Sequence, residues 1–382
     1  RIDERFLNPG DSRDGLTQFE EFVEACRKTG IRLCLDLVLN HIGIDSDMVV
    51  RCPDWIVPDE TEADGHKRAG CWHKRSWIRW EDLVPIYYDH PSTSIRRDIW
   101  NYMKEYALFW SNYAAYTGGM ARFDNLHSST PGFIAELSAA VHGRFPDLAI
   151  LGEYFTDELT LEKTVPEWGI NMLLANSWEH PFGPQLRHYI EYLHRVSGKL
   201  RHLCAITTHD TGVPAQLFGS HRAVMPRYAI CALYTLGQTG MAQGVEAGVE
   251  QRIPFIGAPE KMDFHSGPDH REFITRINNL LATDPIFQQG GNLAFVDDGN
   301  KAILGAWRWP VGRDGGGVLL FANLDIYNMQ HIKVDLSRHK IPQPLNLTDM
   351  LSGNSFDVQG PFMDLDIEAC GVRILKINHN IL

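Results

Sequence analysis

The chain has 382 residues, of which 44% are hydrophobic and ten are tryptophans, a composition that excludes an intrinsically disordered protein. Lysine and arginine number 36 against 48 aspartates and glutamates, and the net charge of −12 argues against partners such as nucleic acid or an anionic membrane. No apolar run approaches the ~18 residues that a membrane-spanning helix needs.

The first elements alternate between helices and apolar strands. Residues 15–29 place Phe19, Val23 and Cys26 on one helical face, and Gly30 ends this helix. The run 31–39 is almost wholly apolar, as expected of a strand that is buried on both faces. The same alternation recurs further along the chain. Later helices are expected at 97–116 and 131–143, and later strands at 119–124, 148–153, 170–175, 202–207 and 238–243.

This alternation predicts a parallel sheet with right-handed crossovers. A chain of this length without a glycine-rich dinucleotide loop fits a (β/α)8 TIM barrel better than a doubly wound fold. The strands between 31 and 243 number six, whereas a closed barrel needs eight. We therefore expect residues 1–287 to form a barrel that lacks its first two strands in this chain.

A long excursion, 42–96, separates the first strand from the next helix. Long loops at the carboxyl ends of barrel strands usually build the active site. The aromatic rings of this stretch either stack against a ligand or form a small satellite core, and both readings stay open. These rings belong to Trp55, Trp72, Trp77, Trp80, Tyr87 and Tyr88.

Beyond residue 287 the helical periodicity gives way to β-rich runs separated by turn residues. The clearest runs are 302–309, 317–323, 331–336 and 371–377. This pattern predicts a C-terminal antiparallel β-sandwich over 288–382.

Polar residues follow four of the predicted barrel strands at the point where each strand ends. Because the carboxyl ends of barrel strands meet at one face, such side chains point toward the site. Three carboxylates, Asp124, Glu153 and Asp210, are therefore expected to converge. The other polar residues at these strands are Asp36, Asn40, His41, Arg122, His127 and His209.

Converging carboxylates suit glycosyl transfer with retention, which uses an ionised nucleophile and a protonated acid about 5–5.5 Å apart. Arg122 lies two residues before Asp124 on the same strand face, so we expect its charge to keep Asp124 ionised. A third carboxylate would raise the pKa of the acid by repulsion. Neutral His41 and His209 can bond sugar hydroxyls.

Each residue also has a structural reading. A lone aspartate at a strand end is often a helix N-cap. Asp36 could instead bond a neighbouring strand end, His127 could cap the following turn, and His209 alone would more often be structural. The joint pattern on four strands is much less expected by chance.

The motif set resembles that of the α-amylase family, glycoside hydrolase family 13. The sequence DLVLNH at 36–41 resembles its first signature, and GMARFD at 119–124 resembles its second. GE at 152–153 and THD at 208–210 resemble the third and fourth, and QGVE at 243–246 is similar to the eighth-strand motif. All five occur in the family's order, and the resemblance covers essentially the whole chain.

The resemblance implies a retaining enzyme that acts on α-glucan or maltooligosaccharides and requires no cofactor. It implies Asp124 as nucleophile, Glu153 as general acid and base, and Asp210 as the carboxylate that stabilises the transition state. Asn40 matches a calcium ligand of the family, but the excursion offers no identifiable partner set for calcium. The residues implied to bind substrate are Arg122, His209, His41, Asp36 and His127.

Hydrolysis of α-1,4 bonds is the main reading, and a 4-α-glucanotransferase or maltosyltransferase is the alternative. Residues 125–130 and Thr156 resemble the glucanotransferase domain of glycogen debranching enzymes and, more loosely, maltosyltransferases, which raises the odds of transfer. The sandwich could bind glucan through Trp307 and Trp309. The main expectation, however, is that it is a stabilising cap, a domain that adds stability and does not bind glucan.

Two other function classes are alternatives to the glucan-active enzyme. A metal-dependent hydrolase would use Asp36, His41, His209 and Asp210 as ligands, but the chain has no HxH pair and no HExxH motif. A non-catalytic barrel that only binds glucan is the other class, and the presence of all three carboxylates with Arg122 argues against it.

Overall fold

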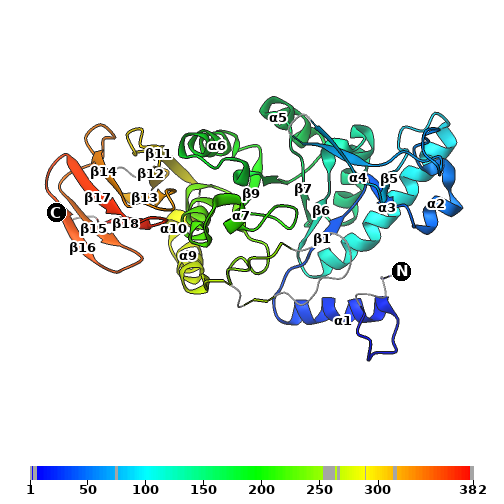
Figure 1. Ribbon diagram of the computed structural model, residues 1–382, viewed down its shortest axis with the longest axis horizontal. Helices are drawn as coiled ribbons and strands as arrows, with labels where there is room; N and C mark the ends of the chain where they lie inside the picture. The colour runs from blue at the N-terminus through cyan, green and yellow to red at the C-terminus, as the bar shows by residue number, and fades with distance from the viewer. Residues whose placement is uncertain are drawn as a thin grey trace. The chain divides into compact units, whose positions relative to one another are not determined.

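The computed structural model describes residues 2, 7–73, 76–252, 263–264, 267–288, 290–312 and 316–378 (Figure 1). The chain divides into two compact units, Arg1–Leu174 and Ala175–Leu382. The predicted boundary between barrel and sandwich, at residue 287, stays a prediction. Among the described residues, no helix is both long and apolar enough to cross a bilayer.

The first unit is built on a parallel sheet in the order β1, β6, β7 and β8. These strands cover Cys34–Leu37, Met120–Phe123, Ala149–Gly152 and Met172–Ala175. The long helix α3 (Thr93–Tyr116) packs against β1, β6 and the helix α4 (Pro131–Arg144) (Figure 1). Helix α1 (Gly15–Lys28) agrees with the helix predicted at 15–29, and α5 (Glu158–Glu167) is a further helix, between β7 and β8, that was not predicted.

Local chemistry sets the ends of these elements. Asp14 caps α1 by accepting from the backbone N–H groups of Leu16 and Thr17. Gly30 ends the helix with a φ of 77°, a left-handed conformation that glycine adopts without steric penalty. Gly119 lies so close to Leu33, the residue before β1, that a Cβ there would stand 1.8 Å from the carbonyl oxygen of Leu33.

The expectation that the first strand is buried on both faces is wrong. Strand β1 spans only Cys34–Leu37, and Cys34 and Asp36, which share a face, are exposed, while Leu37 is buried. Among the described strands of this unit, β1 pairs only with β6, so no neighbouring strand covers its other edge. An apolar run therefore marked the strand correctly but overstated its burial.

The excursion after β1 is a set of short pieces. Strand β2 (His41–Gly43) pairs antiparallel with β5 (Leu83–Pro85), and β3 (Gly70–His73) pairs with β4 (Ser76–Arg79). Helix α2 (Asp47–Arg51) and the 3₁₀ turn η2 (Pro53–Trp55) lie between them in sequence. A second 3₁₀ turn, η3 (Leu126–Ser128), follows β6.

The second unit begins with two parallel strands, β9 (Arg201–Ala205) and β10 (Gln238–Gly240). The last predicted strand of the alternation, 238–243, is thus shorter than expected. The helical elements of this unit are η4 (Ser177–Glu179), α6 (Gly183–Val196), α7 (Pro214–Phe218), η5 (His221–Ala223), α8 (Val224–Ala229), the π-helix η6 (Ile230–Tyr234), α9 (Arg271–Thr283) and α10 (Pro285–Gln288).

The C-terminal part consists of two antiparallel sheets, as the sequence predicts. One sheet has the order β11, β12, β13, β18, β15 and β16, and β14 pairs with β17 in the other (Figure 1). Residues of both sheets share one apolar core. The strand bounds are Gly291–Phe295, Ile303–Pro310, Gly317–Asn323, Gln330–Asp335, Leu345–Asp349, Ser355–Val358, Phe362–Ile367 and Val372–Asn378 for β11 to β18 in chain order.

Trp307 belongs to this core and is only 8% exposed. Its indole N–H donates to the carbonyl of Gly316 at 3.2 Å, and its ring stacks on Trp309 with 4.1 Å between the centroids. A ring buried in this way stabilises the sandwich and presents little surface to a ligand, which supports the cap reading.

Candidate active site

Arg122 is the centre of a buried ionic cluster in the first unit. It lies on β6, is 7% exposed, and bonds the carboxylate of Asp36 on the neighbouring strand β1. One guanidinium nitrogen, Nη1, lies 2.9 Å from Asp124, and the other, Nη2, lies 3.1 Å from Glu153. The structure thus brings together Asp36, Arg122, Asp124 and Glu153, as the strand-end pattern predicts.

One cation shared among three carboxylates leaves the cluster with excess negative charge. Burial raises the pKa of Asp124 to about 6, and the nearby carboxylate of Glu153 adds to this rise, while Arg122 opposes it. Arg122 thus acts on Asp124 in the expected direction, but burial and Glu153 outweigh it, so the pKa of Asp124 stays above its ordinary value. Burial lowers the pKa of Arg122, but Glu153 and the other carboxylates outweigh it and raise that pKa well above its ordinary value.

Backbone hydrogen bonds join the segment around Asp124, after β6, to Glu153, after β7. The N–H of Asn125 donates to the Glu153 side chain at 3.0 Å, and the N–H of Leu126 donates to the Glu153 carbonyl at 2.9 Å. The N–H of Glu153 in turn donates to the carbonyl of Phe123 at 3.0 Å. The residue that follows Asp124 therefore fixes the position of Glu153.

Asn125 is not among the predicted site residues, although it begins the segment 125–130 that resembles glucanotransferases. It is 4% exposed, has a left-handed backbone with φ of 49°, and its side-chain amide has no hydrogen-bond partner in the part of the chain that the structure describes. Left-handed backbone and buried unpaired polar groups are both costly and gather at functional sites. Its sequence signals are its place directly after Asp124 and its place in the segment 125–130.

Asn40 and His41 join this cluster from the end of the first strand. The side-chain amide of Asn40 donates to the carbonyl of Asn125 at 2.8 Å, and its oxygen pairs with Nδ1 of His41. Burial lowers the pKa of His41, although the charges of Asp124 and Asp82 oppose this, so the ring is neutral near pH 7.

His127 and Asp36 have different settings from those of the central pair. His127 lies in η3, where its exposed ring stands 6.2 Å from the ring of Phe155. Asp36 bonds Arg122 on the neighbouring strand, which is the structural reading, yet its side chain is still 40% exposed and can reach a ligand.

The aromatic rings of the excursion divide between the two readings. The Tyr88 ring is buried and stacks on Phe133 with 4.3 Å between the centroids, so it belongs to a satellite core. The ring of Trp80 instead lies 5.1 Å from that of His41, beside the carboxylate cluster, and Trp77 is 45% exposed. The side chain of Trp72 lies outside the described part.

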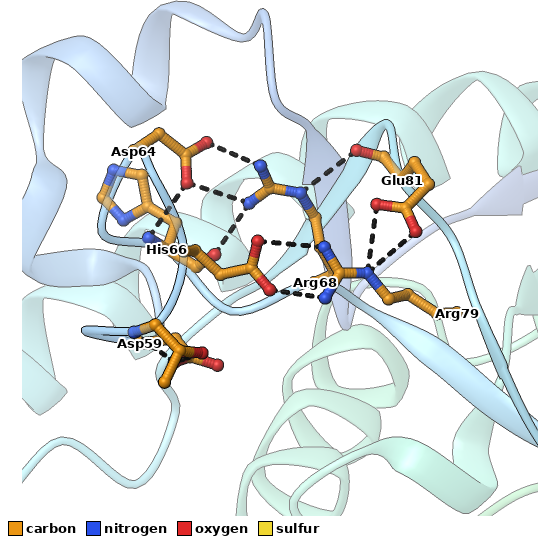
Figure 2. A network of polar contacts seen from close by, with 8 residues as sticks. Asp59, Asp64, His66, Arg68, Arg79 and Glu81 are labelled. Carbon is orange, nitrogen blue, oxygen red and sulfur yellow. Dashed lines mark hydrogen bonds and ion pairs between the residues drawn. The ribbon is translucent and has the colours of Figure 1, made fainter.

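An ion-pair network holds the β3–β4 hairpin that carries Trp77 (Figure 2). Arg79 bonds Glu62 through two nitrogen atoms and also bonds Glu81. Arg68 bonds Asp64 at 2.9 Å and donates to the carbonyl of Glu81 at 3.1 Å. Glu62 and Glu81 flank the hairpin in sequence, so these contacts tie the hairpin to the segments on either side of it.

His209 and Asp210 lie in the second unit, on the loop that follows β9. Nε2 of His209 stands 3.3 Å from the Asp210 carboxylate, and both side chains are well exposed. His209 and Gln243 line a small open hollow that also includes Arg252. That Asp210 meets Asp124 and Glu153 stays a prediction.

Among the described residues, no three histidine, cysteine, aspartate or glutamate side chains are grouped so that they could hold a metal ion. The described part of the chain therefore offers the metal-hydrolase alternative no set of such ligands.

The fold is that of the α-amylases. The α-amylase of Geobacillus thermoleovorans, solved in complex with acarbose, matches with a TM-score of 0.70 and 16% identity over 96% of this chain and 81% of that one. No family model matches the chain. The (β/α)8-type barrel with a C-terminal β-sandwich is thereby confirmed as the fold class.

The sequence is similar to bacterial α-1,4-glucan:maltose-1-phosphate maltosyltransferases. The one from Methylacidiphilum infernorum is 22% identical over 97% of this chain, and the one from Myxococcus xanthus is 25% identical over 91%. The chain spans about half the length of these relatives, 56% and 52% respectively. The resemblance to the α-amylase family, and to its maltosyltransferases, is thereby confirmed.

Proposed function

We propose that this protein is a retaining α-glucan-active transferase that moves a maltosyl or longer α-glucosyl group to the end of an α-1,4-glucan. The observation that carries the proposal is the pair Asp124 and Glu153 on adjacent nitrogen atoms of one buried guanidinium. Retention needs two carboxyl groups at short range, and this arrangement supplies them. The names of the relatives favour transfer over the hydrolysis that was our main expectation.

Asp124 attacks the anomeric carbon of the donor and forms a covalent glycosyl ester. With a pKa of about 6, the Asp124 carboxyl group is mostly ionised at pH 7, as a nucleophile must be. Glu153 donates a proton to the leaving oxygen, then removes one from the acceptor hydroxyl that attacks the ester. Two displacements at one carbon restore its configuration.

The surplus of negative charge around Arg122 serves this scheme. Three carboxylates and one guanidinium carry two negative charges when all are ionised, so the site favours holding one proton. The proposed chemistry requires that proton on Glu153 when the donor binds. Asp210 and His209, in this proposal, contact sugar hydroxyls once a glucan is bound.

Transfer and hydrolysis share the first step and differ in what attacks the ester. A half-exposed indole such as Trp77 favours a sugar acceptor, because aromatic faces stack on the apolar faces of sugars. The ring of Trp80 lies 5.1 Å from that of His41, and it supports an acceptor site on the excursion.

The proposal is tested by incubating the 382-residue protein with maltose 1-phosphate and maltohexaose. Transfer predicts phosphate release together with products that are longer by steps of two glucose units, and none of either with Asp124→Asn. Release of phosphate with free maltose alone would mean hydrolysis. Longer and shorter products from maltohexaose without the phosphate ester would indicate a 4-α-glucanotransferase. No turnover of either substrate would contradict the proposal.

A further inference from the structure

Asn40 sits at a junction between the loop of the nucleophile and a histidine of the site. It is 6% exposed, and both ends of its side-chain amide are engaged by protein atoms. One end meets the carbonyl of Asn125, the residue after Asp124, at 2.8 Å. The other end meets Nδ1 of His41.

The carbonyl of Asn125 determines which way the Asn40 amide points. A carbonyl oxygen can only accept, so the group facing it must be the Asn40 NH₂ and not its oxygen. The amide oxygen therefore faces His41, and because that oxygen can only accept, Nδ1 of His41 must carry the proton. In a neutral imidazole this leaves Nε2 as a hydrogen-bond acceptor.

Calcium does not fit this arrangement. A calcium ligand needs a free oxygen lone pair in a set of six to eight oxygens. One of the two lone pairs of the Asn40 oxygen already accepts from His41, and no three histidine, cysteine, aspartate or glutamate side chains among the described residues are grouped so that they could hold a metal. The role that the family resemblance implied for Asn40 is therefore not supported by its contacts.

We infer that Asn40 is a positioning residue that holds His41 in the Nδ1–H form, so that Nε2 can accept a hydrogen bond from a substrate hydroxyl. Through its other contact, to Asn125, Asn40 also links the His41 ring to the loop that follows the nucleophile. The identity of the hydroxyl rests on the proposed function, but the tautomer does not. The ring of Trp80, whose centre lies 5.1 Å from that of His41, limits rotation of the imidazole.

The direct test is the ¹⁵N NMR spectrum of the ring nitrogen atoms of His41 in histidine-labelled protein, with His41→Gln to assign the signals. The wild type should show protonated Nδ1 and unprotonated Nε2 at neutral pH. Asn40→Leu, which removes the acceptor, should shift the ring toward the Nε2–H form. Asn40→Asp keeps the acceptor and should retain the Nδ1–H form. An Nε2–H ring in the wild type would overturn the inference, even if neither variant folds.

Turnover provides a second readout. Asn40→Leu should lower kcat/KM about 10-fold or more, and its penalty should shrink with a donor that lacks the hydroxyl bonded by His41. Asn323→Leu is the matched control, because it removes a buried amide of the sandwich that donates to the carbonyls of Ile367 and Glu368. It should leave the His41 signals unchanged.

The last experiment tests for calcium binding at Asn40 by thermal unfolding. Added Ca²⁺ or a chelator should leave the Tm of the wild type unchanged. A rise in Tm with Ca²⁺ that Asn40→Leu abolishes would overturn the inference and restore the calcium role. Because the tautomer and the Tm are measured without turnover, a protein that proves inactive would contradict the proposed function and leave this test intact.

Discussion

Replacing Asp124 by asparagine should make the protein more stable at neutral pH while it removes turnover. The aspartate has a pKa of about 6 in the fold, against an ordinary value of 3.8, because it is buried beside Glu153. At pH 7 the fold must keep this carboxylate ionised among like charges. The asparagine has nearly the same shape, carries no charge, and can still accept from Arg122 through its oxygen.

The magnitude follows from linkage. A pKa that is raised by about two units corresponds to about 3 kcal/mol of unfolding free energy, at ~1.4 kcal/mol for each unit. Below pH 3.8 the aspartate is protonated in both the folded and the unfolded protein, so its raised pKa no longer lowers the unfolding free energy. Between pH 4 and 6 the unfolded chain loses the proton while the folded chain keeps it, so wild-type stability falls as pH rises. Above pH 6 the aspartate is ionised in both states, and the full loss of about 3 kcal/mol in unfolding free energy remains.

The assay is urea unfolding of wild type and Asp124→Asn at several pH values from 4 to 8. The difference in unfolding free energy should be near zero at the acid end and should grow to about 3 kcal/mol in favour of the variant above pH 6. Asp357→Asn is the control and should show no such trend, because this exposed aspartate of the sandwich accepts from the uncharged side-chain amide of Asn346. A variant that is less stable at pH 7, or a difference that does not depend on pH, would refute the reasoning.

Three further predictions concern neighbouring features. Arg122→Met leaves three carboxylates without their cation, so the unfolding free energy should fall by about 3–5 kcal/mol. The acid limb of the pH–rate profile should move to higher pH, because Arg122 no longer lowers the pKa of Asp124. An acid limb that does not move would contradict the ionic cluster. Gly119→Ala forces a Cβ against the carbonyl of Leu33 and should lower unfolding free energy by about 3 kcal/mol in a urea titration, whereas the exposed Gly198→Ala, with open space, should not. Trp80→Ala should lower kcat/KM about 10-fold with a loss of only about 1–2 kcal/mol in stability, and equal kcat/KM would exclude a role beside His41.

The sequence alone predicted the elements that carry strong periodic patterns. Helix α1 ends one residue before its predicted limit, and β6 and β7 lie inside their predicted runs. Helix α6 was missed although its signal is present, since the buried residues Leu186, Ile190 and Leu193 recur at helical spacing. The π-helix η6 could not be predicted, because its five residues are all apolar and buried and show no period.

The site was predictable as far as strand ends determine it. Arg122, Asp124 and Glu153 meet because parallel strands deliver their carboxyl ends to the same edge. The pKa of Asp124 was not predictable, because it depends on how many carboxylates share Arg122 and on how deeply they lie. The left-handed conformation of Asn125 likewise depends on contacts from Asn40 and Glu153, which are distant in sequence.

The most direct test of the central claim is to trap the glycosyl ester on the nucleophile. The 382-residue protein is incubated with a fluorinated maltosyl donor whose ester forms faster than it breaks down, and the adduct is located by peptide mass spectrometry. The account predicts one added maltosyl group on Asp124, which disappears when maltohexaose is supplied as an acceptor. An adduct on another residue, or turnover of the true donor by Asp124→Asn, would contradict it.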